Sequence, residues 1–438
     1  MFKYLHQIWQ SKTLRSKILF TLFVLLVFRI AAHISVPGVN HQVLGNLFEQ
    51  NALLGVFSAL TGGNMENFSI ILMGLSPYIN ASIIIQLMTV VIPKLENLSK
   101  EGMEGRRKIN HYTRILTIPL ALLQSYGMII LLNNGASKAG GAGGMLIQNI
   151  GDPMVILPIM IIITAGTLLM MWFGELITEK GIGNGISLLI FANIISGMPT
   201  IVGRMLATGT AGDTTKLSYF MLFVLMTIIM LIFVVLITEG QRNVPITYAT
   251  RATGGKGEKS SLPIRVNQAG MIPIIFAVSL VTFPSVISQF FQVSKSVTLQ
   301  NLASFIVKYF NATNPSYAYL IIYFLLIIAF SYFYVGVTFN PDNVAENIQK
   351  RGGFIPGIRP GKQTAEFLGT VSNRMNLFGG IFLGIVAIIP VLFTKYTVLS
   401  KSDLIISGSG LIIVVGVVLE LIRQIDAQLV MHDYDKLY

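Results

Sequence analysis

The most suggestive residues for chemistry lie in the stretch EKGIGNGIS, which begins at Glu179. Its glycines recur at every second position, as in loops that bind nucleotide phosphates: Gly181, Gly183 and Gly185. A phosphate loop of this kind has to follow a β-strand and open a helix. Long apolar runs flank the stretch instead, and no strand is predicted near it. The sequence therefore predicts a tight connector between two helices, with Asn184 and Ser187 suited to capping the second.

Outside this stretch, the sequence gives little indication of a metal site or a catalytic site. The chain has no cysteine, and its five histidines lack ligand spacing: His6, His33, His41, His111 and His432. No Ser-His-Asp, paired-carboxylate or HExxH arrangement stands at membrane depth. The only clear charge inside an apolar run is Arg29, with His33 one turn along, and this does not make a proton relay. Arg29 is expected to snorkel or to pair with a helix end.

The composition is that of a membrane protein. Of 438 residues, 53% are apolar and 11% charged, against about 25% charged in a soluble domain. A basic start precedes the first apolar run, which has no cleavage site and is predicted to be a retained span. Ten apolar segments are long enough to cross a bilayer: 18–36, 70–92, 113–132, 153–173, 186–203, 217–237, 269–291, 317–337, 376–393 and 404–422.

The basic residues are sorted to one side of these spans. With the N-terminus inside, 23 of the 31 Lys and Arg residues fall in the inside segments and seven in the outside ones. This asymmetry predicts that both termini are cytoplasmic. The net charge of +12 is then mostly a sorting signal, although the long basic inner loops 238–268 and 338–375 could also dock an acidic partner.

Three segments depart from the pattern of uniformly apolar spans joined by polar loops. The piece NALLGVFSALTGG, residues 51–63, predicts a helix too short to span, either on the outer surface or folded back into a cavity. The second span carries Ser76, Asn80 and Gln86, and the seventh opens on Asn267 and Gln268. Both contain an early proline. This polarity suits either hydrogen bonds between helices or a lined passage.

Longer motifs resemble one family. The stretches MGLSPYINASIIIQLM and MWFGELITEKGIGNGISLLIF are similar to the two signatures of the SecY protein-translocation channels. Shorter matches follow in the family's order: EGRRKINHYTR, ITEGQRNVPITYA, LPIRVNQAGMIP and FNPDNVAENIQKRGGFIPGIRPGKQT. Together these motifs run through the chain from end to end and are far more specific than a lone glycine pattern.

The resemblance implies an all-α polytopic membrane protein, with ten transmembrane helices in two inverted five-helix halves around a central hourglass pore. The halves would be residues 1–204 and 217–438, joined by a hinge at 205–216. It implies a channel that passes unfolded secretory polypeptides across the membrane and releases transmembrane segments sideways into it. It implies no enzyme activity and no cofactor. A secondary transporter of a small solute is the alternative, which the long inner loops disfavour.

The resemblance also assigns site residues, by their positions in the motifs. A plug at about 52–63 would use Leu54, Phe57 and Leu60. The lateral gate, between spans two and three on one side and seven and eight on the other, would carry Gln86 and Asn267. A pore ring would consist of Leu75, Ile79, Ile190, Ile275 and Ile413. A docking surface would consist of Arg251, Lys350, Arg351 and Arg359.

Partners follow from the same resemblance. They are the small subunits SecE and SecG, the ATPase SecA, the translating ribosome, signal sequences, unfolded preproteins and membrane lipids. The location implied is the bacterial cell membrane. No Walker motif occurs in the sequence, so the driving force has to come from a partner.

Overall fold

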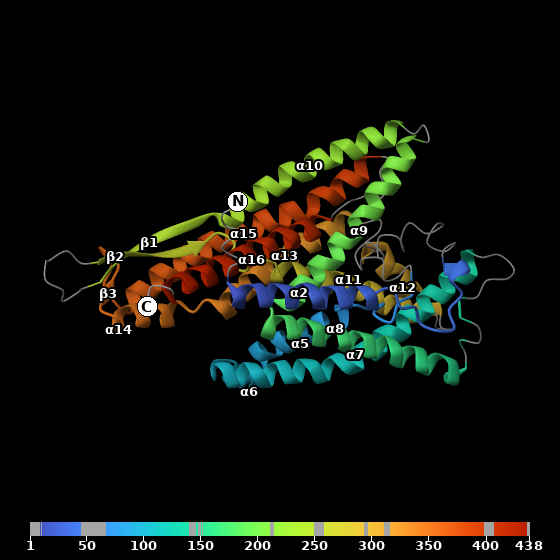
Figure 1. Cartoon of the computed structure of the whole chain (residues 1–438), viewed down its shortest axis with the longest axis horizontal. Coiled ribbons are helices and arrows are strands. Elements are labelled where there is room, and N and C mark those ends of the chain that lie inside the picture. The colour runs from blue at the N-terminus through green and yellow to red at the C-terminus, as the bar shows by residue number, and fades with distance from the viewer. Residues whose placement is uncertain are drawn as a thin grey trace.

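The computed structural model describes residues 9, 11–44, 67–139, 146–147, 150, 152–210, 214–248, 258–292, 297–310, 316–397 and 407–435. These residues form an elongated, mostly helical molecule in which most helices run along the long axis (Figure 1). The predicted short helix at 52–63, with Leu54, Phe57 and Leu60, lies outside the described residues, as does Arg251.

The named elements in the described residues of the first part of the chain are all helices. Its helices are α2 (Lys12–Ala31), α5 (Ser76–Val91), α6 (Pro93–Lys100), α7 (Met103–Ala139), α8 (Pro153–Lys180), α9 (Gly185–Thr210) and α10 (Thr214–Glu239). The link between α9 and α10, within the predicted hinge, falls on residues outside the described part.

The second part adds a small sheet to its helices. The helices are α11 (Ile272–Gln292), α12 (Val297–Phe310), α13 (Tyr317–Thr338), α14 (Pro341–Lys350), α15 (Lys362–Tyr396) and α16 (Gly408–Asp435). The strands are β1 (Gln241–Tyr248), β2 (Glu258–Arg265) and β3 (Gly353–Phe354).

Each of the ten predicted spans coincides with a helix: α2, α5, α7, α8, α9, α10, α11, α13, α15 and α16. Among the described residues, seven helical stretches are long and apolar enough to cross a membrane, and the bent pair α5–α6 would make an eighth. The pair bends by 105° at Pro93, because a proline disfavours helical backbone in the residue before it. The chain is therefore a multi-pass membrane protein, and the count of ten spans is consistent with these helices.

The second span begins later than the sequence predicts. The segment before Ser76 forms turns instead of helix. Phe68 and Gly74 have positive φ angles of 43° and 53°, and Ser69 forms an isolated bridge with Ser35. Such angles interrupt a right-handed helix, so α5 is shorter than the apolar run that contains it.

The sheet was not predicted from the sequence. Its strand order is β2-β1-β3, and β1 pairs antiparallel with both neighbours. In β1, Val244 and Ile246 are buried while the residues between and before them are exposed, as expected for a half-buried strand. Prolines and charges break this alternation elsewhere in the loop, which explains why the sequence signal was weak.

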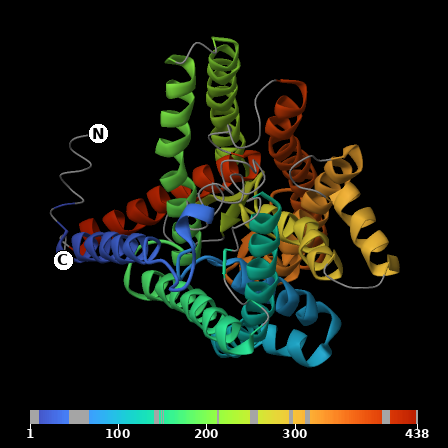
Figure 2. The same ribbon diagram turned by 90° about the vertical axis from the view of Figure 1, so that its right-hand side faces the viewer.

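Three apolar clusters form most of the core. One lies among α10, α11, α13, α15 and α16 and also includes Ile83 of α5. A second joins the residues around Phe68 to α7 and α8. The third is central and is shared by α2, α5, α8, α9 and α16, with residues of and before α11. Figure 2, which looks along the long axis of the molecule, shows light-blue and teal helices in the lower part and the yellow and orange ones to the right. The red helix α16 reaches across to the left, toward the dark-blue α2.

Candidate pore constriction and gate

Five apolar side chains that the resemblance assigns to a pore ring belong to the central cluster. They are Leu75 at the N-cap of α5, Ile79 in α5, Ile190 in α9, Ile275 in α11 and Ile413 in α16. Leu75 and Ile413 are buried, and the other three are half-buried. Branched apolar side chains from four separate helices thus belong to one apolar cluster, and none of them offers a ligand to an ion.

The helices α5 and α11 begin in similar ways, and this places their ring residues near the helix starts. Gly74 precedes α5 and Gly270 precedes α11, with positive φ angles of 53° and 65°. Pro77 and Pro273 are the second residues of the two helices. Glycine adopts the left-handed angle without steric cost, and proline is tolerated where no intrahelical N–H bond is lost. Each helix therefore starts abruptly, and its first turns carry the ring side chains.

The predicted gate helices are in contact. Helix α5 packs against α11, and Ile83 of α5 belongs to the same buried cluster as Ile274 and Phe276 of α11. Gln86, one of the two polar gate residues, is half-buried and donates from Nε2 to Ser82 Oγ of its own helix over 3.2 Å. The amide is therefore bonded along α5.

Asn267, the other polar gate residue, is buried just before α11. A Cβ at Gly379 of α15 would overlap the carbonyl of Val266, so α15 approaches this segment closely because it has a glycine there. The next residue, Gln268, accepts at Oε1 from Ser372 Oγ of α15 over 2.9 Å. The foot of α11 is thus fastened to α15.

The glycines of EKGIGNGIS make three close contacts. A Cβ at Gly181 would overlap Thr21 Oγ1 of α2, and one at Gly185 would overlap the carbonyl of Gly174 in α8. Gly183 has a φ of 84°, and its N–H donates to Gln424 Oε1 of α16 over 2.7 Å. The predicted close approach of neighbouring helices is confirmed.

The same loop caps the helix that follows it. Asn184 Oδ1 accepts from the N–H groups of Ile186, over 3.1 Å, and Ser187, over 3.2 Å. Asn184 is therefore the capping residue, as predicted, whereas Ser187 supplies a backbone donor to the cap. Ile182 N–H donates to Thr21 Oγ1 over 3.1 Å, which joins the loop to α2 a second time.

Arg29 bonds to another helix. Its Nη1 donates to Ser196 Oγ of α9 over 3.0 Å. His33 lies one turn further on and makes its own contact between Nδ1 and the Arg29 carbonyl, over 2.9 Å. This arrangement links α2 to α9 by hydrogen bonding, which polar side chains commonly do between membrane helices.

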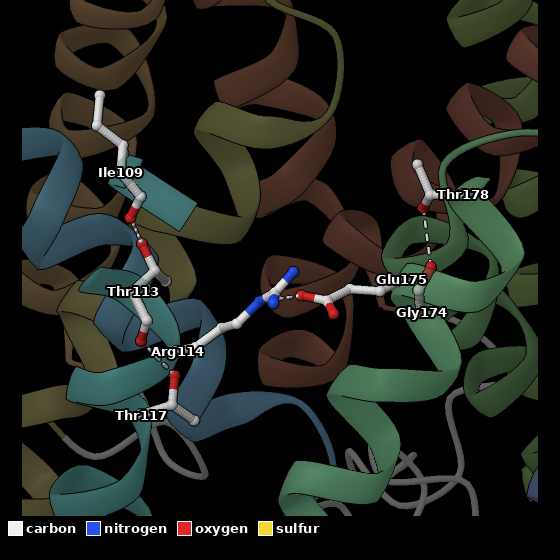
Figure 3. Close-up of polar contacts among 7 residues, drawn as sticks. All are labelled: Ile109, Thr113, Arg114, Thr117, Gly174, Glu175 and Thr178. Carbon is white, nitrogen blue, oxygen red and sulfur yellow. Dashed lines mark hydrogen bonds and ion pairs between the residues drawn. The ribbon is translucent and has the colours of Figure 1, made fainter. Parts of the chain in front are cut away.

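An ion pair that the sequence analysis missed joins α7 to α8. Arg114 Nε lies 2.6 Å from Glu175 Oε1, and both side chains are partly exposed. Figure 3 shows the two side chains reaching across the space between their helices, beside hydroxyls that bond along their own helices, such as Thr113 to Ile109 and Thr178 to Gly174. A sequence signal existed, because the connected ends of consecutive antiparallel spans, and the ends opposite them, lie in pairs on the same side, and here one such pair carries opposite charges.

Comparison with known proteins identifies the family. A sequence model of the SecY family matches residues 69–422. The chain belongs to the SecY family. It is 42% identical to the protein translocase subunit SecY of Bacillus licheniformis, with 99% of each chain covered. It is 40% identical to the protein of the same name in Bacillus subtilis, again over 99% of each.

Solved channel structures share the SecY-like fold of the chain. A structure described as that of a protein conducting channel gives a TM-score of 0.64 at 18% identity, covering 95% of this chain and 92% of that one. Sec61 in a canine ribosome-channel complex gives 0.60 at 18% identity with the same coverage. At this identity the likeness establishes the fold.

In this SecY-family chain, the two predicted docking loops form one platform. A small apolar core unites the sheet with α14 and α15. Its buried members are Val244, Ile246, Ile264, Ile348, Ile355, Leu368 and Val371. Loops that the sequence treats separately, 238–268 and 338–375, therefore pack against each other.

The predicted docking residues that are described lie on the outside of this platform. Arg359 is exposed on a turn between Gly357 and Gly361, whose φ angles are 83° and 95°. The turn is tied to α15, since Thr364 Oγ1 donates to the Arg359 carbonyl over 2.9 Å. Lys350 and Arg351 are also exposed, and Lys350 Nζ lies 2.7 Å from Glu346 Oε1 of its own helix.

An ion pair joins the end of α10, where the platform begins, to α16. Glu239, the last residue of α10, pairs with Arg423 of α16. Burial and then the charge of Arg423 lower the pKa of Arg265 at the end of β2, and the carboxylate of Glu239 opposes this shift. Leu14 of α2, Ile182 and Leu429 of α16 share a further cluster. The start of α2, the loop 181–185 and the end of α16 therefore lie on the side of the sheet.

Proposed function

We propose that this chain conducts unfolded secretory polypeptides across the bacterial cell membrane and releases transmembrane segments laterally into it. Membership of the SecY family supports the translocation of polypeptides directly, because the relatives of the chain are protein translocase subunits. The chain is therefore a protein-conducting channel. The single structural observation that supports the mechanism is that five branched apolar residues at or in α5, α9, α11 and α16 belong to one apolar cluster.

The ring of Leu75, Ile79, Ile190, Ile275 and Ile413 is proposed as the constriction. Apolar side chains cannot replace the hydration shell of an ion, and a narrow apolar passage tends to dewet. The same side chains are held by packing alone and can part around a polypeptide. The ring would therefore resist ions at rest without a specific ligand for any substrate.

The lateral gate is proposed to open between α5 and α7 on one side and α11 and α13 on the other. The contact of α5 with α11 is apolar around Ile83 and Ile274, so a hydrophobic segment could replace it at little cost. Gln86 and Asn267 would lie along the route. The residues proposed as the plug, Leu54, Phe57 and Leu60, would close the pore from outside.

The two halves, 1–204 and 217–438, are proposed to move about the hinge at 205–216. The sheet-bearing side is proposed to be cytoplasmic, with both termini there, because the basic residues gather on it. The chain is proposed to have no enzyme activity and no cofactor. Energy would come from the SecA ATPase or the translating ribosome, docked at Arg359, Arg251, Lys350 and Arg351, with SecE and SecG as membrane partners.

The proposal is tested by reconstitution. The chain, with its small membrane subunits, is placed in vesicles and given a secretory precursor, the ATPase and ATP. The expected result is ATP-dependent protection of the precursor from added protease. Absence of protection, while a relative such as the Bacillus subtilis protein protects the same precursor with its own partners, would contradict the proposal.

A further inference from the structure

Helix α12 has one apolar and one polar face along its length. Leu299, Leu302 and Phe305 follow one another at intervals of three residues, while Ser304 lies on the side away from Leu302 and Asn301 lies at the border between the two faces, four residues before Phe305. Residues three and four apart share a face of a helix. At 14 residues, α12 is about 21 Å long and too short to cross a bilayer.

The apolar face of α12 is left uncovered although the helix is packed. Ala303 is fully buried, and α12 runs against α11. Leu299, Leu302 and Phe305 nevertheless remain 38%, 49% and 61% exposed. Asn301 and Ser304 are exposed as well. Full immersion in lipid would leave the polar side chains without hydrogen-bond partners. Full immersion in water would expose the apolar face to solvent.

The C-terminal end of α12 is fixed at the level where a membrane span begins. Ser316, the N-cap of α13, donates from Oγ to the carbonyl of Tyr309 over 3.1 Å. From that point α13 carries an exposed apolar stripe at intervals of four: Tyr317, Ile321 and Leu325. The end of α12 therefore lies next to the start of a candidate spanning helix whose apolar stripe is also exposed.

The position of α12 in the molecule selects one leaflet. The helix lies toward the end of the molecule opposite the β1–β2 hairpin (Figure 1). Its sequence contains no acidic residue and a single basic one, Lys308, so a zwitterionic or anionic headgroup layer would not repel it.

We propose that α12 is an interfacial helix that binds lipid. Its Leu299, Leu302 and Phe305 face would lie at the boundary of headgroups and acyl chains, in the leaflet opposite the sheet. Interfacial helices have this pattern of one apolar and one polar face. Because α12 packs on α11, the lipid contact anchors the end of a gate helix to that leaflet.

The natural absence of cysteine allows a direct test. Single cysteines at Leu302 and Phe305, and matched ones at Asn301 and Ser304, receive a nitroxide label in phosphatidylethanolamine–phosphatidylglycerol vesicles. Leu325→Cys gives the reference for a residue in lipid. Collisions with oxygen, which concentrates in lipid, are compared with collisions with a water-soluble nickel chelate. We expect the oxygen-to-nickel ratio at 302 and 305 to be several-fold above that at 304 and close to that at 325, with an intermediate ratio at 301, which borders Phe305.

Two results would overturn the lipid contact. Equal, low ratios on both faces would place the helix in water. Shielding of the labels at 302 and 305 from both reagents would mean that protein covers this face. The measurement requires no translocation, so its failure and failure of the proposed channel function are separate results.

Discussion

Gly183 donates its backbone N–H to the side chain of Gln424 over 2.7 Å, which fastens the loop between α8 and α9 to α16. The two residues are distant in sequence, and no motif of the sequence links them. The left-handed backbone of Gly183 turns its N–H toward α16, and the loop is held from the other side by Thr21.

Removing the Gln424 acceptor tests this fastening. Gln424→Leu leaves the Gly183 N–H without its partner, which typically costs about 1–3 kcal/mol for a buried group and less for one that water reaches. We expect a lower midpoint of thermal unfolding for the detergent-solubilised protein. Gln424→Glu keeps an acceptor at the same place and is expected to stay near the original midpoint. Identical midpoints for the Leu variant and the unchanged protein would contradict the role.

The ion pair between Arg114 and Glu175 predicts measurable coupling between α7 and α8. A double-mutant cycle with Arg114→Ala and Glu175→Ala is expected to give about 0.5–1 kcal/mol, because the pair is close but partly exposed. The free energies of unfolding come from denaturant titration in mixed micelles.

A matched control for this cycle exists on α7 itself. Arg107 and Glu104 also pair, at 3.7 Å, but both side chains are more than 70% exposed. Their coupling is expected to be near zero, since water screens such pairs. Equal coupling free energies in the two cycles would mean that the Arg114–Glu175 pair does not stabilise the packing of α7 on α8.

Reversing the charge of Arg359 is predicted to block export. Arg359→Glu alters an exposed cation on the turn between Gly357 and Gly361, so the fold is not expected to change. Export of a secretory precursor is expected to stop while the variant remains inserted and stable in the membrane. Lys362→Glu, three residues away, is the control and is expected to reduce export much less. Normal export in Arg359→Glu cells would refute the docking role.

Deleting residues 52–63 tests the proposed plug. The deletion is expected to leave a folded channel that leaks ions and accepts defective signal sequences, because loss of contacts in the closed state shifts the population toward the open one. Ion leak is measured in vesicles. An unchanged leak would favour a surface helix for this segment.

Much of the architecture could be predicted from the sequence because bilayer thickness and the hydration of charges dictate it. The ten apolar runs coincide with helices, and EKGIGNGIS is a connector because glycines allow its close contacts. The start of α5 was predicted too early, since the positive φ angles of Phe68 and Gly74 are invisible to hydropathy.

What the sequence could not provide depends on contacts between distant residues. The pairing of β1 with β3 requires Thr247 to meet Phe354, and nothing local indicates that register. Arg114 and Glu175 were counted only as charges near span ends. The five ring residues were selected by resemblance, because branched apolar side chains of this kind occur throughout the spans, and their roles remain predictions.

The conductance of the resting channel tests the central claim most directly. Ile79, Ile190 and Ile275 are changed together to serine, and the control changes Val91, Ile195 and Leu280, which are exposed on the same three helices, to serine. In planar bilayers the first variant is predicted to conduct ions at rest and the control to stay closed, because only the first wets the constriction. Equal conductance of the two triple variants would contradict the ring.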